Sequence, residues 1–338
     1  MEIAALEGGL TLDKLSTGYG SRLVTRDISW HIPYGRLVSL LGANGSGKST
    51  LLKAIALGSE ALSGRVCIDG TDLSRKTLQE RARTVAVVLN DVEYERRLTV
   101  EELVAIGRIP YTGFMGSLQH EDRTAIHNAL LQCGLKGYER RRLGTLSDGE
   151  RQRAFVARAF AQQTPLVLLD EPTAHLDLAH RMALYRLLRD MAHRSQRIVL
   201  VSCHELQLAV NTSDEIGILT HEGELIHGIP EELALQNAYE KLFPGEHFIF
   251  DPVRGIVEEE PTMGRFVQVE GSGAQKTLIP YAEAMLRRLG YRVTSAGQEP
   301  ELHLVIGENQ WTLDTDVRKE SYPSLTALAE RLQRITIR

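Results

Sequence analysis

Long apolar runs are missing from this chain of 338 residues. No stretch approaches the roughly 18 apolar residues that cross a bilayer. No basic segment followed by an apolar one marks a signal peptide. We therefore expect a cytoplasmic chain that acts at a membrane only where another subunit brings it there.

Cysteine and positive charge are also scarce. The spacing of Cys67, Cys133 and Cys203 fits neither disulfide pairs nor a metal site, so we expect buried thiols in a reducing compartment. The net charge of −5 argues against a general nucleic-acid binder, although it leaves local basic patches open. No nucleic acid partner is expected.

Apolar segments of strand length alternate with helical segments over the first two thirds of the chain. This alternation predicts an α/β fold with a largely parallel sheet. Residues 91–162 are predicted to be mostly helical and to form a lobe inserted in that fold. Within the lobe, Thr99 and Glu102 have the spacing of a capping box, which predicts a helix that runs to Gly107. The strands are expected near residues 37–41, 84–89, 166–169, 197–202 and 214–219.

The character of the sequence changes near residue 246. Residues 251–264 hold two prolines and three consecutive glutamates, which is typical of a solvated linker. The segments beyond predict a small α+β domain. The expected organisation is a nucleotide-binding domain at 1–245, a linker at 246–264 and the small domain at 265–338.

Residues 42–49 match the pattern G-x-x-x-x-G-K-[ST] between a predicted strand and a predicted helix. Glycines in such a loop let backbone N–H groups curl around phosphate oxygens, and the helix N-terminus adds partial positive charge. Lys48 is expected to reach the β- and γ-phosphates, and Ser49 to hold Mg²⁺. The predicted nucleotide-binding residues of this segment are Gly42, Asn44, Gly45, Ser46, Gly47, Lys48, Ser49 and Thr50.

Two adjacent acids end the predicted strand at 166–169. Asp170 is placed where a carboxylate can face Mg²⁺. Glu171 lies one residue on, where it can take a proton from an attacking water. Ordinary acids at a strand end are the alternative.

The segment 146–152, which contains Ser147 and Gly149, precedes this strand and opens a predicted helix. With the glycine loop and the acidic pair, this order resembles the ATPase subunit of ATP-binding-cassette (ABC) machines, over about residues 8–240. The resemblance implies a P-loop ATPase core in which Ser147 and Gly149 bind the γ-phosphate of a second copy. It therefore implies a homodimer that traps two ATP–Mg²⁺ complexes.

Three further positions match the family. Tyr19 is similar to the aromatic residue that stacks on adenine, although a core or surface tyrosine is the alternative. Residues 172–177 resemble the loop that links the two sites, with Asp177 as its acid. His204 resembles the switch histidine that contacts the γ-phosphate.

The chain departs from the family pattern at three positions. Asp148 stands where glycine is usual, and Glu150 where glutamine is usual. Carboxylates that point at the phosphates would weaken closure of the dimer, but we expect both to face away, with Glu150 favoured at a helix start. Asn90 stands where glutamine is usual; it is predicted to act on Mg²⁺ or water with a shorter reach.

Residues 98–113 resemble the ATPases that power uptake of iron–siderophores, haem and cobalamin. In that family the helical lobe receives the cytoplasmic coupling helix of a membrane permease, and an external substrate-binding protein delivers the cargo. The resemblance places the chain on the inner face of the cell membrane. The permease and the binding protein hold the substrate contacts, so this sequence does not name the cargo.

Two questions stay open at this point. A soluble ABC ATPase that remodels a protein or nucleoprotein complex is the alternative to an importer subunit. The small C-terminal domain lies outside the resemblance; it is a regulatory module, a dimer-stabilising appendage or a passive extension.

Overall fold

The computed structural model describes residues 8–20, 22–89, 95–113, 116–174, 176–243, 248–251, 256–259, 264–294, 299–308, 310–315 and 318–336. The chain divides into two compact units. The first is Met1–Pro244 with Pro252–Ile256, and the second is Gly245–Asp251 with Val257–Arg338.

The centre of the first unit is a six-stranded sheet in the order β10-β9-β3-β8-β7-β6. All its neighbouring strands are parallel except β9 and β10. Leucine, isoleucine and valine dominate β3, β7 and β8, which are buried along their whole length, as strands covered on both faces are. The predicted α/β core is therefore confirmed. The strands are β3 (Leu37–Gly42), β6 (Val85–Val88), β7 (Leu166–Leu169), β8 (Ile198–Ser202), β9 (Glu215–Leu219) and β10 (Leu225–Gly228).

A second sheet of antiparallel strands lies beside α1 (Lys48–Leu57). Its inward side chains, such as Leu10 and Leu12, share one core with Leu51 of α1 and Leu40 of β3. This core holds the start of α1 firmly at the carboxyl end of β3. The strands of this sheet are β1 (Gly9–Tyr19), β2 (Arg22–Pro33), β4 (Ala61–Ile68) and β5 (Thr71–Asp72).

The opposite face of the central sheet is covered by α6 (Leu178–Ser195) and α7 (Leu206–Thr212), which both contact β3. Here the buried hydroxyl of Ser39 is 2.7 Å from that of Ser213. Short helical segments complete the edges of this unit: η1 (Leu73–Arg75), α2 (Leu78–Ala82), α8 (Pro230–Leu235) and η3 (Ala238–Leu242).

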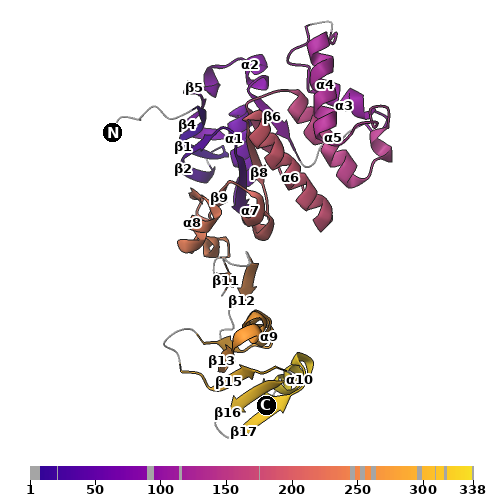
Figure 1. Ribbon diagram of the computed structural model, residues 1–338. Coiled ribbons are helices and arrows are strands. Elements are labelled where there is room, and N and C mark those ends of the chain that lie inside the picture. The colour runs from indigo at the N-terminus through magenta and orange to yellow at the C-terminus, as the bar shows by residue number, and fades with distance from the viewer. Residues whose placement is uncertain are drawn as a thin grey trace. The chain divides into compact units, whose positions relative to one another are not determined.

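The predicted helical lobe is present as α3 (Val100–Ile106), α4 (His120–Gln132), η2 (Leu143–Thr145) and α5 (Asp148–Ala161). These helices gather at one side of the unit in Figure 1. Thr99 and Glu102 form the predicted capping box at the start of α3. A buried ion pair between Arg108 and Asp122, at 2.8 Å, ties the end of α3 to α4.

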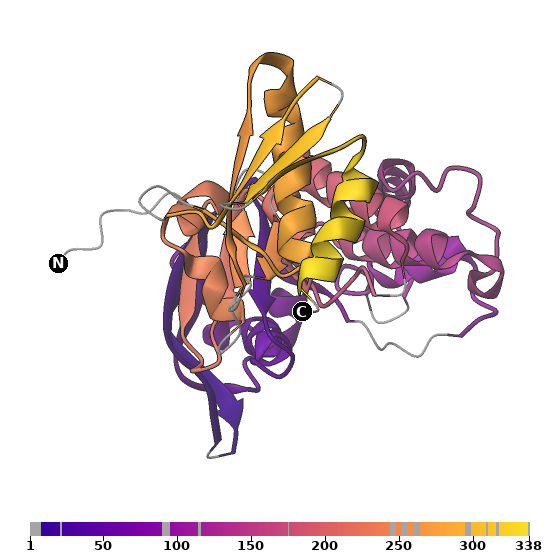
Figure 2. The ribbon, with the colours of Figure 1, turned by 90° about the horizontal axis from the view of Figure 1, so that it is seen from below.

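The second unit has a five-stranded sheet in the order β14-β13-β15-β16-β17. In Figure 2 its two helices lie side by side along this sheet. Apolar residues such as Leu304, Leu286 and Leu328 form its own core. The elements are β13 (Phe266–Gly271), η4 (Gly273–Leu278), α9 (Ile279–Arg288), β14 (Arg292–Val293), β15 (Leu302–Ile306), β16 (Trp311–Thr315), β17 (Arg318–Tyr322) and α10 (Leu325–Thr336).

Some expectations differ from the structure. Strands β11 (Phe248–Asp251) and β12 (Ile256–Glu259) pair with each other inside the segment predicted to be a linker. Cys133 and Cys203 are buried free thiols as predicted, but Cys67 is only partly buried. In the described part of the chain, no helix combines the length and apolarity that a membrane crossing requires.

Candidate functional site

The loop between β3 and α1 has a backbone that requires glycine. Gly45 and Gly47 have φ of 78° and 105°, in the left-handed region that other residues rarely adopt. A Cβ on Gly47 would also collide with Val24. The Ser46 hydroxyl is buried and has no hydrogen-bond partner among the described residues. An unsatisfied buried donor at a helix start fits a phosphate oxygen.

Lys48 lies under this loop and is 4% exposed. Its Nζ donates to the carbonyls of Gly42 and Ala43, at 2.9 and 3.1 Å. Burial lowers the pKa of Lys48 below its usual value, and the carboxylates of Glu171 and Asp170 act against this shift. The ammonium group is thus placed inside an anion-binding loop.

Asp170 follows β7 and meets residues from two neighbouring elements. Its Oδ1 accepts from the Ser49 hydroxyl at 3.1 Å and from the Ser202 hydroxyl at 2.6 Å. Ser202 ends β8 and also accepts from the backbone N–H of Glu171 at 2.8 Å. The sequence reasoning missed Ser202, whose only signal is its place at the carboxyl end of a predicted parallel strand.

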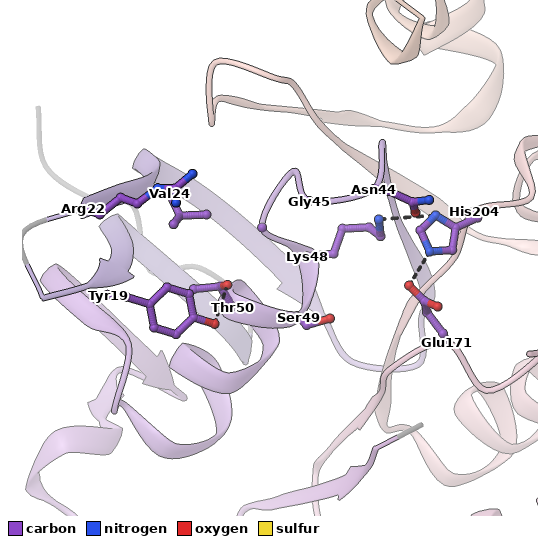
Figure 3. A pocket seen from close by; sticks show the side chains of 11 residues that line it. Tyr19, Arg22, Val24, Asn44, Gly45, Lys48, Ser49, Thr50, Glu171 and His204 are labelled. Atoms are coloured by element: carbon purple, nitrogen blue, oxygen red, sulfur yellow. Dashed lines mark hydrogen bonds and ion pairs between the residues drawn. The ribbon is translucent and has the colours of Figure 1, made fainter. Parts of the chain in front are cut away.

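Glu171 and His204 are in direct contact, as the close view in Figure 3 shows. His204 Nε2 is hydrogen-bonded to Glu171 Oε1. On the other side of the ring, Lys48 Nζ lies 3.4 Å from Nδ1. An ammonium group can only donate, so His204 Nδ1 accepts from Lys48. Nε2 therefore carries the ring proton and donates a hydrogen bond to the Glu171 carboxylate. Glu171 has a φ of 46°, an uncommon conformation for a residue with a side chain and one found often at active sites.

A cavity of about 320 Å³ joins these groups to Tyr19. Tyr19 is 53% exposed, and its hydroxyl is 3.0 Å from that of Thr50. Two lining residues, Arg22 and Val24, were not predicted; both lie in β2, where Arg22 pairs with Tyr19 of β1. The residues that line the cavity are Tyr19, Arg22, Val24, Asn44, Gly45, Gly47, Lys48, Ser49, Thr50, Glu171 and His204.

Ser147, Gly149 and Asp177 do not line this cavity. Ser147 is the N-cap of α5, and its hydroxyl accepts from the N–H of Glu150 at 3.2 Å. Asp177 is the N-cap of α6 and accepts from the N–H of His180 at 2.9 Å. The predicted site residues therefore fall into two groups: those around the glycine loop and the cavity, and those at the starts of α5 and α6.

The two unusual carboxylates beside Ser147 have partners on their own chain. Glu150 accepts from the N–H of Ser147 at 2.8 Å and lies 3.4 Å from Arg141. The hydrogen bond from Ser147 lowers the pKa of Glu150, and Arg141 contributes to the shift. Asp148 is paired with Arg151.

Several known proteins are similar to this chain. A profile of the ABC transporter family matches residues 25–174. Over 204 residues the chain is 38% identical to the iron(3+)-hydroxamate import ATP-binding protein FhuC of Bacillus subtilis, a match that covers 60% of this chain and 76% of that relative. It is 35% identical over 242 residues to the hemin import ATP-binding protein HmuV of Streptomyces coelicolor, covering 72% and 84% of the two chains.

The chain belongs to the ATP-binding subunits of ABC transporters. Among solved structures it is similar to a chain of the dimeric structure of MJ0796, a bacterial ABC transporter cassette. The TM-score is 0.56 at 25% identity, over 65% of this chain and 98% of that one. The subunit binds and hydrolyses ATP, and the hydrolysis of ATP powers an ABC importer. Cassettes of this family dimerise and work with membrane permeases. The alternative of a soluble remodelling ATPase is not favoured by these relatives.

One predicted residue of this ABC subunit is outside the part that the structure describes. Asn90, expected to act on Mg²⁺ or water, follows β6 beyond Leu89, where the described residues stop and resume at Glu95. Its role stays a prediction. The roles of the other site residues are also proposals.

Proposed function

We propose that this subunit powers uptake of a metal chelate of the iron–siderophore, haem or cobalamin kind. The observation that carries the proposal is the pair of relatives whose names specify iron(3+)-hydroxamate and hemin. The predicted lobe segment 98–113 supports it from the sequence alone. The subunit would lie on the inner face of the cell membrane, and an external substrate-binding protein would deliver the cargo to its permease.

The contacts around Asp170 support the assignment of roles at the phosphates. Ser49 and Asp170 present two oxygens at 3.1 Å from each other, and hard oxygen donors suit Mg²⁺. Bound with ATP, Mg²⁺ would neutralise charge that develops on the phosphates. Lys48 would hold the β- and γ-phosphates, and Tyr19 would stack on adenine.

Glu171 is the proposed base. In the hydrogen bond between the two residues, His204 donates to Glu171 through Nε2, so the carboxylate stays an acceptor. An attacking water beside Glu171 would give its proton to this carboxylate. His204 would position Glu171 and contact the γ-phosphate.

The separation of the site residues into two groups supports a composite site. Ser147, Gly149 and Asp177 are not among the residues that line the cavity of their own chain, and Ser147 and Asp177 begin α5 and α6. In a head-to-tail homodimer they would face the γ-phosphate held by the other copy. Closure around two ATP molecules would move the helical lobes and the permease, and hydrolysis would reopen the dimer.

The permease would dock on the helical lobe near the predicted segment 98–113. In that segment Ile109 is 62% exposed and Ile106 is 41% exposed. Exposed apolar surface on a soluble protein often marks a contact with another protein.

Purification of the tagged chain from membranes tests the proposal. We expect a polytopic permease to co-purify, and cells that lack the chain to lose uptake of an iron–hydroxamate, haem or cobalamin. A Lys48→Ala copy should not restore uptake. Co-purification with ribosomes or DNA instead of a polytopic protein would favour the remodelling ATPase.

A further inference from the structure

The first turn of α6 touches three segments that the proposed mechanism uses. His180 contacts the loop acid Asp177 twice. Its backbone N–H donates to Asp177 Oδ1, and its ring Nδ1 lies 2.9 Å from both carboxylate oxygens. Both side chains are more than half exposed, so burial does not fix them. The ring is held by the carboxylate.

The same ring lies beside Gly149 at the start of α5. A Cβ built on Gly149 would be 2.7 Å from His180 Cδ2 and 3.4 Å from Nε2. Any side chain at position 149 would therefore displace the ring. Gly149 leaves room for this ring, and a larger residue there would move the exposed ring away from the start of α5.

This ring contact bridges a gap between two helices. A cavity of about 300 Å³ lies alongside it, and its lining residues come from both α5 and the start of α6: Gly149, Arg153, Leu176, Ala179, His180, Ala183 and Leu184. The His180 ring lines this cavity together with Gly149. A shift of α5 would therefore reach the loop through the His180 ring.

The next residue, Arg181, links the same loop to the catalytic contacts. Its Nε donates to the carbonyl of Leu176 at 2.5 Å, and its Nη1 pairs with Glu205 Oε2 at 2.8 Å. Glu205 follows His204, which is bonded to Glu171. A contact line thus leads from Gly149 to the His180 ring, and the chain continues to Arg181. From Arg181 the ion pair reaches Glu205, whose neighbour in the chain is His204.

We propose that His180 and Arg181 are positioning residues that couple the two ATP sites of the dimer. In the proposed head-to-tail dimer, on which this inference rests, His204 serves the chain's own ATP and Gly149 serves the ATP of the other copy. The contact line joins these two residues within one chain. Occupation of one site would then set the position of the signature segment at the other.

The test is the ATP dependence of hydrolysis by the full-length chain with its co-purified permease. The wild type should be cooperative, with a Hill coefficient that approaches the number of sites, about 2. His180→Ala and Arg181→Gln should each lower it towards about 1 and raise the half-saturating ATP concentration by roughly 2- to 30-fold. His180→Asn should retain part of the cooperativity, because its amide can still donate to Asp177.

Two controls separate coupling from folding. Arg186→Gln makes the same substitution at an exposed arginine on α6 and should leave the Hill coefficient unchanged. Thermal melting identifies any variant that fails to fold, and Arg181→Gln carries the test if His180→Ala is unstable. The double variant should lose no more than the stronger single variant, because residues of one contact line are not additive.

The outcomes distinguish the two proposals. A wild-type complex without ATP-dependent hydrolysis would overturn the proposed function, and the inference with it. A wild type that hydrolyses ATP without cooperativity would overturn the coupling alone. Folded His180→Ala and Arg181→Gln variants that keep the wild-type Hill coefficient would do the same.

Discussion

At the scale of single residues, the catalytic end of the site depends on a few polar contacts at strand ends. His204, which lies beside Lys48, is hydrogen-bonded to the Glu171 carboxylate, and the Ser202 hydroxyl accepts from the Glu171 backbone N–H. These contacts fix the Glu171 carboxylate in spite of a left-handed backbone. A residue held in this way is suited to act on a water molecule without reorganisation.

Replacement of Glu171 by glutamine tests this placement. Glu171→Gln should still bind ATP, because Lys48 and the glycine loop are untouched, but its turnover should fall by about 10²–10⁴-fold. ATP hydrolysis and nucleotide binding are measured on the same preparation. Glu240→Gln, at an exposed glutamate, is the matched control. Near-normal hydrolysis by Glu171→Gln would remove it as the base.

At the scale of elements, helix starts are where sequence and structure agree best. Capping boxes open both α3 and α5, and each consists of a hydroxyl residue and a glutamate three positions later. This pattern satisfies N–H groups that have no partner within the helix. The Glu150 carboxylate therefore accepts a hydrogen bond at the start of its own helix.

Acid titration tests the role of Glu150. Its pKa is lowered from 4.5, so its stabilisation is present above that pH and is lost as the pH falls through the lower folded value. Glu150→Gln keeps a cap but does not titrate. We expect its urea unfolding midpoint to be less sensitive than that of the wild type to acidification below pH 4.5.

Equal acid sensitivity of the two proteins would contradict this role. At neutral pH the glutamine variant should hydrolyse ATP at least as well as the wild type, because Glu150 points to Ser147 and Arg141. Slower hydrolysis by the folded variant would mean that the carboxylate itself contributes to the ATP site.

Several strands were harder to predict than the helices. Strand β17 contains Arg318, Lys319 and Glu320, so its sequence has little of the apolar alternation that marks a half-buried strand. Strand β12 includes two residues of the glutamate run that indicated a linker. Both strands form by pairing with a neighbour, and pairing depends on partners that a local pattern does not reveal.

At the scale of the whole molecule, the two units have separate hydrophobic cores. The core around Leu40 and Leu51 shares no residue with the core around Leu286 and Leu304. Separate cores are the usual property of domains that fold on their own. The predicted domain boundaries stay a prediction that truncation can test.

A chain that ends at Phe243 should therefore fold and hydrolyse ATP. Circular dichroism and an ATPase assay check this, and size-exclusion chromatography reports its oligomeric state. Unchanged transport with loss of an effector response would assign regulation to the second unit. A shift of the truncated chain to a monomer would mean that the second unit stabilises the dimer. Unchanged transport, response and oligomeric state would mean that it is a passive extension. An unfolded product would contradict the separation into domains.

The sequence by itself determined the glycine loop, the capping box of α3 and the order along the chain of the central parallel strands. These features depend on backbone conformations and hydrogen bonds between residues that are close in the chain. The tertiary structure decided which distant groups meet. Ser49 reaches Asp170 across 121 positions, and the His180 ring reaches Gly149. Such contacts follow from the order of strands in the sheet and the packing of α5 and α6 around it, which no local pattern specifies.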